Sequence, residues 1–225
     1  MQGELENNSK SIDGKRLKIA ILIAFLFVFL LWIIKAFELI DGVSYYKLGV
    51  YPRKFSGLLG ILLAPFIHSD LNHIINNSVS FFILLTGLIY FYRDLSFKVL
   101  IFIWLLSGLM VWIGAREAYH IGISGIIYGI ASFMFFSGVF RKDTRLMAIS
   151  LLVVFLYGGM VWGVLPVYPT ISWEYHLFGA ISGLIAAVYY RKEGPQRHMW
   201  SWELEEDDED ESKDETDTFN QSPML

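Results

Sequence analysis

Three stretches of this sequence carry side chains suited to nucleophilic catalysis. The first, GISGIIYG (residues 122–129), holds Ser124 between glycines, and the second, HLFGAISG (residues 176–183), begins with His176. A serine hydroxyl becomes a good nucleophile when a neighbouring base accepts its proton, and neutral imidazole suits that role near pH 7. Taken alone, Ser124 is more often a helix cap or a packing residue, and His176 an interfacial one. The pair is therefore a hypothesis that the surrounding elements must support.

The third stretch, HSDLNHIINN (residues 68–77), adds groups that can donate hydrogen bonds to a developing negative charge. His73 and Asn77 are four residues apart, so they share one face of a helix and can point into the same small volume. His68 and His73 are five residues apart, off one helical face, and no Glu or Cys completes a zinc set. The sequence has no cysteine, Walker loop or dinucleotide fingerprint. We therefore expect neither a metal site nor a cofactor.

The elements that carry these stretches are long apolar segments. Hydrophobic residues make up 55% of the 225, and runs of about 20 apolar residues match a hydrocarbon core about 30 Å thick. The first run is too long and too apolar for a signal peptide, and no small-residue cleavage site follows it. The sequence predicts an all-α polytopic membrane protein with six transmembrane helices, at residues 17–37, 71–92, 97–114, 123–140, 146–164 and 175–190.

The basic residues set the predicted orientation, because loops rich in Lys and Arg stay on the cytoplasmic side. With the N-terminus inside, the inner segments hold 12 Lys and Arg residues and the outer segments hold 5, so both termini are expected in the cytoplasm. Eleven of the 22 acidic residues lie between positions 203 and 217, and such dense like charge predicts a disordered tail. The chain thus divides into a cytoplasmic N-terminal segment (1–16), a six-helix membrane domain (17–192) and an acidic cytoplasmic tail (193–225).

This topology brings three candidate groups to one depth in the membrane. Spans two, four and six run from outside to inside, and the basic residue that closes each lies 16 residues after Asn77, 17 after Ser124 and 15 after His176. At 1.5 Å per residue these lengths are about 22–26 Å, so all three side chains are expected just beneath the outer surface. Polar groups inside a membrane are costly and by default indicate function.

Glycines next to the candidates predict that spans four and six pack closely. Gly179 and Gly183 follow His176 at i+3 and i+7 and therefore share its helical face. Gly125 and Gly129 form a second small-xxx-small pair in span four, and such pairs let helix backbones approach each other in lipid. The serine and the histidine could then form a hydrogen bond.

The connection between the first two spans, roughly 30 residues long, is expected to lie partly in the membrane interface. Three other polar residues carry no functional hypothesis. His120 and His198 are expected to be interfacial or solvated, and Glu174 is expected to face water.

In combination, the three stretches resemble the rhomboid family of intramembrane serine proteases. GISG matches the family's GxSG nucleophile motif, HSDLNHIINN its second-span HxxxxHxxxN motif, and HLFGAISG its last-span histidine with following glycines. The resemblance covers roughly residues 17–192 and implies a six-helix, rhomboid-like bundle. One departure concerns the first outer loop, where Leu59 and Gly60 stand in place of a Trp-Arg pair that family members often carry. That difference bears on how the loop seats in the membrane.

By position, the resemblance implies that Ser124 is the nucleophile and His176 its general base. The backbone N–H of Ser124 and the side chains of His73 and Asn77 would form the oxyanion hole. No carboxylate is expected at this depth, so a Ser–His dyad is indicated instead of a triad. The ring of Tyr128 is expected against the imidazole, and the other supporting residues are His68, Gly122, Gly125, Gly179 and Gly183.

The resemblance implies hydrolysis of peptide bonds in or near transmembrane segments of membrane-protein substrates, near the outer face of the cell membrane. The lipid bilayer is the other expected partner, and no nucleic acid is expected. Two alternatives are an inactive relative that binds membrane clients, which would typically have lost the serine or histidine, and a small transporter, which would need paired intramembrane charges along a full pathway. Residues 158–175 are read either as a mobile cap, with span five as a lateral gate, or as a static interfacial loop.

Overall fold

The computed structural model describes residues 2–144, 147–148, 151–152, 155, 163–166 and 172–194. Over these residues the chain is helical, and there is no β-strand beyond one isolated bridge between Val50 and His120. The long helices are α1 (Gln2–Asp41), α3 (Leu71–Tyr92), α4 (Asp94–Gly114), α5 (Ser124–Arg141) and α8 (Trp173–Tyr189).

Five of the six predicted membrane spans coincide with these helices. α3 has the bounds expected for the second span, whereas α1 begins well before residue 17 and continues past residue 37. In the described part of the chain, α1 from Asp13 onwards, α3, α4 and α5 are long and apolar enough to cross a membrane. The predicted all-α membrane bundle is therefore confirmed. Most of the predicted fifth span, and all of the acidic tail after residue 194, lie outside the described residues.

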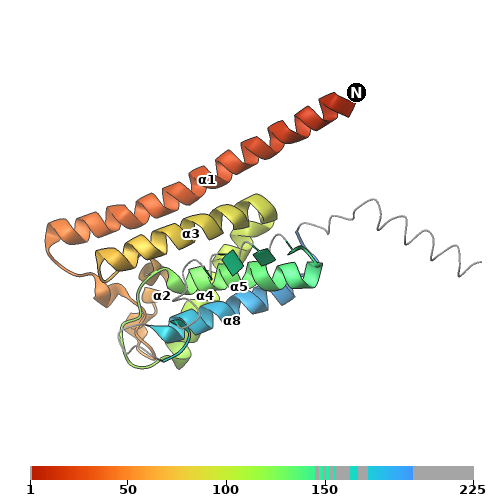
Figure 1. Ribbon diagram of the computed structural model, residues 1–225. Coiled ribbons are helices and arrows are strands. Elements are labelled where there is room, and N and C mark those ends of the chain that lie inside the picture. The colour runs from red at the N-terminus through yellow and green to blue at the C-terminus, as the bar shows by residue number, and fades with distance from the viewer. Residues whose placement is uncertain are drawn as a thin grey trace, which may run out of the picture. The chain divides into compact units, whose positions relative to one another are not determined.

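Helices α5 and α8 lie side by side (Figure 1), and their backbones touch at two pairs of glycines. A Cβ atom added to Gly179 would overlap the carbonyl oxygen of Gly125, and one added to Gly183 would overlap that of Gly129. In lipid, where apolar surface gives no drive for helices to associate, small residues allow the close van der Waals contact that holds them together. These are the same glycines whose spacing predicted that the two spans pack closely.

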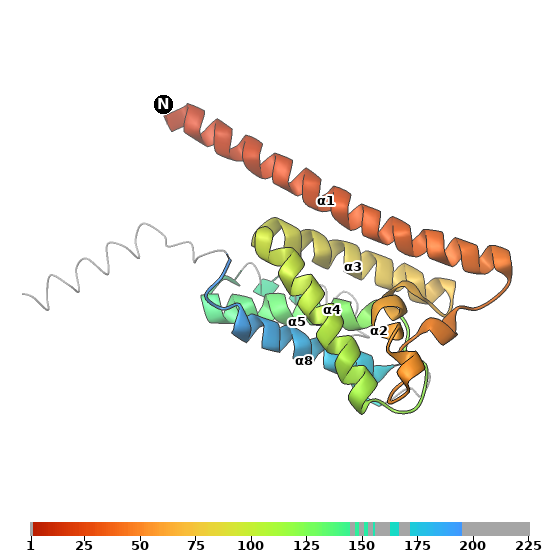
Figure 2. The same ribbon diagram turned by 180° about the vertical axis from the view of Figure 1, so that it is seen from behind.

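The other long helices pack around this pair in order: α4 contacts both α5 and α8, α3 contacts α5, and α1 contacts α3. α1 packs along α3, where Trp32 Nε1 donates to Ser78 Oγ at 3.0 Å and the rings of Phe27 and Phe81 lie 6.1 Å apart. Seen from behind, α4 crosses in front of α5 and α8 (Figure 2). The apolar core lies between α3, α4, α5 and α8, and its fully buried side chains include Leu84, Ile103, Ile130 and Phe133.

The first loop, residues 42–70, is folded into short helical turns, which are η1 (Tyr46–Leu48), η2 (Phe55–Gly57), α2 (Gly60–Leu63) and η3 (Ala64–Phe66). It packs on α4, where Trp104 Nε1 donates to the carbonyl of Ile61 at 2.8 Å. It also holds the segment that precedes α5, because the Gly122 N–H donates to the carbonyl of Ala64 at 2.9 Å. The loop thereby sets the position of the chain just before Ser124.

The glycine contacts predict that one added methyl group lowers the stability of the fold. Gly179→Ala would force α5 and α8 apart, and overpacking of this kind typically costs about 1–3 kcal/mol. We expect a lower midpoint of unfolding, measured by SDS titration or by heating in detergent. Gly14→Ala is the matched control, because a Cβ there meets no atom within 4 Å and Ala favours a helix over Gly. Equal stability of the two variants would contradict the close-contact argument.

Candidate active site

Ser124 and His176 meet where α5 and α8 begin. Ser124 is the first residue of α5, and His176 lies in the first turn of α8. The distance between Ser124 Oγ and His176 Nε2 is 2.8 Å, which is a hydrogen bond. Ser124 is buried, so this contact is shielded from bulk water.

The other ring nitrogen fixes the direction of this hydrogen bond. His176 Nδ1 lies 2.8 Å from the carbonyl oxygen of Gly163. A carbonyl oxygen can only accept, so Nδ1 carries the hydrogen and Nε2 of a neutral ring presents its lone pair. The hydroxyl of Ser124 therefore donates to Nε2, the arrangement that a general base requires. Sequence reasoning missed Gly163, because a backbone carbonyl gives no signal in residue type.

Tyr128, one turn after Ser124, covers a face of the imidazole. Its ring stacks on that of His176, with centroids 4.3 Å apart and an interplanar angle of 9°. A Cβ atom on Gly163 would overlap the Tyr128 hydroxyl and lie 3.0 Å from His176 Nδ1. Stacking and the carbonyl contact together restrict both the tilt and the rotation of the imidazole.

The side chains of His73 and Asn77 converge beside the segment that leads into Ser124. A Cβ on Gly122 would lie 2.9 Å from His73 Nε2 and 3.6 Å from Asn77 Nδ2. Gly122 has a φ of +101°, which L side chains rarely adopt, so glycine is required there for both conformation and space. Asn77 Nδ2 is buried and has no hydrogen-bond partner among the described residues. A buried donor without a partner is costly in a resting protein, which makes it a candidate for binding a developing negative charge.

The start of α3 is built to hold His73. Asp70 caps the helix, because its Oδ1 accepts from the backbone N–H of His73 at 2.9 Å. Ser69 Oγ lies 3.1 Å from His73 Nδ1 and 2.7 Å from Asp70 Oδ2. The hydrogen bonds from the Ser69 hydroxyl and the His73 N–H hold the pKa of Asp70 below its usual range, so the cap is charged near neutral pH.

A buried ion pair in α1 supports the same region. Lys35 Nζ contacts Glu38 Oε2 at 2.6 Å and also donates to the backbone carbonyls of His68 and Ser69, at 2.9 and 3.3 Å. Glu38 in turn accepts from the backbone N–H of Tyr45 at 2.8 Å. The pair therefore ties both ends of the first loop to α1. In the sequence, this ion pair is indicated by two opposite charges three residues apart near the end of an apolar segment.

His68 is a neighbour of His73 and makes no hydrogen bond through its ring among the described residues. The two rings meet edge to face, with centroids 5.0 Å apart. Burial, with a smaller contribution from the nearby His73, lowers the pKa of His68 to about 3, so this ring is neutral. Within the described residues no three His, Asp or Glu side chains are grouped closely enough to hold a metal ion.

Two expectations about polar residues were wrong. His120 and Glu174 are buried, with exposed fractions of 1% and 4%, although the sequence suggested contact with water or the interface. The first loop covers the segment that contains His120, and Glu174 pairs with Arg116 at 3.4 Å. The burial of His120 and Glu174 could not be predicted from hydropathy, because it depends on how segments distant in the sequence fold. His198 lies outside the described residues.

The arrangement as a whole has the parts needed for acyl transfer. A serine hydroxyl donates to an imidazole whose tautomer is fixed, and a buried amide and a second imidazole lie beside the serine's helix N-terminus. Unpaired backbone N–H groups at such a terminus favour negative charge. The described residues therefore bring together Ser124, His176, Tyr128, His73 and Asn77, with His68 packed beside them.

Comparison with known proteins assigns the chain to a family. The Rhomboid domain matches residues 56–193. The chain is 34% identical to the Uncharacterized protein Rv1337 of Mycobacterium tuberculosis over 188 residues, 76% of this chain and 74% of the relative. It is also 34% identical to the Uncharacterized protein ML1171 of Mycobacterium leprae over 178 residues, 71% and 67% of the two chains. A protein of Acanthamoeba polyphaga mimivirus that is named as a rhomboid protein is 27% identical over 147 residues, 60% of this chain and 77% of the relative. The chain belongs to the rhomboid family, the family of intramembrane proteases.

Proposed function

We propose that this chain is an active intramembrane serine endopeptidase that cleaves membrane-protein substrates in or near their transmembrane segments. The observation that carries the proposal is the 2.8 Å hydrogen bond between Ser124 Oγ and His176 Nε2, with Nδ1 of the same ring bound to the carbonyl of Gly163. This arrangement leaves the lone pair of His176 Nε2 free to accept the proton of the Ser124 hydroxyl.

In the proposed reaction, Ser124 Oγ attacks the carbonyl carbon of the scissile peptide bond while His176 Nε2 accepts the hydroxyl proton. The carbonyl oxygen becomes an oxyanion. The backbone N–H of Ser124 and the side-chain amide of Asn77 donate hydrogen bonds to it. His73 Nε2 adds a third donor when it carries a hydrogen, which requires either that His73 Nδ1 accepts from the Ser69 hydroxyl or that the ring is protonated. Preorganised donors stabilise such a charge strongly, because they do not have to reorient as it forms.

The intermediate then collapses, the C–N bond breaks, and His176 gives its proton to the leaving amine. A water molecule next attacks the acyl group on Ser124, with His176 as the base, and release of the acid returns the proton to the serine. The fixed tautomer serves every step, because Nε2 is the nitrogen that takes and gives the proton throughout. No cofactor takes part in these steps.

The proposed setting is the cell membrane, with residues 17–192 as the protease domain and residues 1–16 and 193–225 in the cytoplasm. The excess of Lys and Arg in the predicted inner segments supports this orientation, which puts the dyad near the outer face. An inactive, client-binding relative is less well supported, because the serine and histidine are both present and in contact. The buried ion pair of Lys35 and Glu38 lies at one end of α1 and not along a pathway, so it does not favour a transporter.

Removing either member of the dyad tests the proposal directly. Ser124→Ala and His176→Ala should each lower kcat by roughly 10⁴-fold or more, and the double variant should be no slower, because the two residues act as a unit. The measurement is cleavage of a generic transmembrane substrate by purified protein in detergent, together with covalent labelling of Ser124 by a fluorophosphonate. Cleavage by the Ser124→Ala protein at the wild-type rate would disprove the mechanism.

The oxyanion hole can be tested without touching the dyad. Asn77→Ala should lower kcat by at most about 10²–10³-fold, the contribution of a single donor, while slow labelling of Ser124 is retained. Asn76→Ala is a matched control, since Asn76 is the exposed neighbour on α3 and its change should alter kcat less than about twofold. If the two variants turn over substrate equally fast, Asn77 is a packing residue only.

The carbonyl of Gly163 can be displaced by a single methyl group. Gly163→Ala should lower kcat by roughly 10- to 10²-fold, because the added Cβ would overlap Tyr128 and crowd His176, and small misplacements of a catalytic base are costly. The comparison is kcat of this variant against that of Gly14→Ala, where the methyl group meets nothing. An unchanged kcat would show that the contact at Nδ1 does not matter for turnover.

A further inference from the structure

A second serine–histidine contact lies next to the proposed dyad, with the residue types exchanged. His120 Nδ1 lies 2.5 Å from Ser172 Oγ. His120 is four residues before Ser124, and Ser172 is four residues before His176. Both contacts therefore join the same two segments, and each spans 52 positions of the sequence. The mechanism described above uses only one of them.

The hydrogen bonds around His120 show which ring nitrogen carries its proton. Nε2 lies 3.0 Å from the carbonyl oxygen of Arg116, which can only accept, so Nε2 carries the hydrogen. Nδ1 is therefore the acceptor, and the Ser172 hydroxyl donates to it. Burial lowers the pKa of His120, which keeps this acceptor neutral near pH 7. The charged groups that face the ring are Arg116 and Glu174, which are themselves paired at 3.4 Å.

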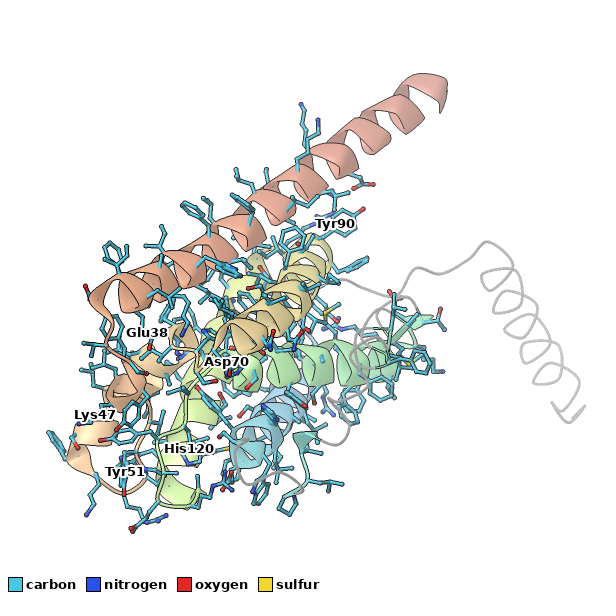
Figure 3. The ribbon with its side chains drawn as sticks, turned by 60° about the vertical axis from the view of Figure 1, so that its left-hand side comes forward. Glu38, Lys47, Tyr51, Asp70, Tyr90 and His120 are labelled. Atoms are coloured by element: carbon cyan, nitrogen blue, oxygen red, sulfur yellow. The ribbon has the colours of Figure 1, made fainter. Side chains whose placement is uncertain are left out.

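On one side, this contact is anchored to the first loop. The N–H of His120 donates to the carbonyl of Val50 at 2.9 Å, and the N–H of Val50 donates back at 3.0 Å. Figure 3 shows His120 at the same end of the bundle as Tyr51 and Lys47, far from Tyr90. The backbone of His120 is thus paired with the first loop, which sets the point from which its side chain reaches Ser172.

On the other side, the contact is anchored to the first turn of α8. Ser172 is the N-cap residue, and its carbonyl accepts from the N–H groups of Tyr175 and His176 at 3.1 and 3.4 Å. An N-cap serine ordinarily uses its hydroxyl to accept from the backbone N–H two or three residues ahead, here that of Glu174 or Tyr175. Here the hydroxyl makes no cap hydrogen bond and is directed to His120 instead. Whatever fixes Ser172 therefore also fixes the turn that carries His176.

We infer that the hydrogen bond between Ser172 and His120 positions His176 opposite Ser124. This inference rests on the proposed function, and it makes Ser172 and His120 positioning residues that do not touch the substrate. The glycine contacts set how closely α5 and α8 approach, and farther along the same helices Ser132 Oγ donates to the carbonyl of Ala180 at 2.7 Å. The hydrogen bond between Ser172 and His120 adds a directional restraint at the end where Ser124 and His176 lie.

The test compares two side chains of equal shape at position 172 in the full chain. Ser172→Thr keeps the hydroxyl and should retain kcat within about threefold of wild type. Ser172→Val differs from the Thr variant only in having a methyl group in place of the hydroxyl, and we expect kcat to fall roughly 10- to 10²-fold while KM changes less than about twofold. The rate of Ser124 labelling by a fluorophosphonate should fall in parallel. Ser182→Ala is the control, because that α8 hydroxyl donates to the carbonyl of Phe178 in its own helix.

A double-mutant cycle covers the case in which the Val variant folds poorly. His120→Phe keeps a ring but no acceptor, so it should lower kcat by itself, and adding Ser172→Val should cause no further loss. Equal kcat in the Thr and Val variants, or losses that multiply in the double variant, would overturn the inference. If instead the wild-type protein fails to cleave, or the Ser124→Ala protein cleaves, the proposed function fails and not this inference alone.

Discussion

The contact between the backbones of α5 and α8 is the constraint on which the rest of the site depends. At Gly125 and Gly179, as at Gly129 and Gly183, there is no room for a single additional carbon atom. Because the two helices begin at the same end, this approach brings the first residue of α5 within 2.8 Å of the first turn of α8. Larger residues at these positions would force the two helices apart. The serine and the imidazole could not then share a proton.

Polar groups near this end of the bundle are held by one another and by backbone carbonyls. Lys35 binds two carbonyls of the first loop, His176 binds that of Gly163, and His120 binds that of Arg116. Each such bond offsets the cost of removing a polar group from water. The buried amide of Asn77 is an exception among the described residues, since its Nδ2 has no partner. Unlike the ring nitrogens of His68, which also lack partners, this donor lies beside the segment that leads into Ser124, where an oxyanion site would require one.

Hydropathy was sufficient to predict most of the membrane helices, because a bilayer imposes one length and one composition on any helix that crosses it. The bounds of α3 were predicted to the residue. Motif spacing and a common depth singled out Ser124, His73, Asn77 and His176, since the spacing of polar residues on a helix is legible in sequence. Burial of His120 and Glu174 was not predictable, because it results from a loop that folds over them. The role of the Gly163 carbonyl could not be predicted, because every residue has a backbone carbonyl and the residue type carries no signal for it.

The proposed dyad also explains why geometry outweighs charge in this site. In a serine–histidine–aspartate triad, a carboxylate fixes the tautomer and stabilises the imidazolium that forms during attack. A carboxylate beneath the membrane surface would itself have to be desolvated, at considerable cost. The carbonyl of Gly163 fixes the tautomer equally well but brings only a dipole. The face of the Tyr128 ring, 4.3 Å from the imidazole, adds a weaker attraction for the cation. With less charge stabilisation available, the proposed reaction would depend more on holding the imidazole at the right distance and angle. The glycine contacts, the stacked Tyr128 ring and the hydrogen bond from Ser172 to His120 all restrict the segments that carry it.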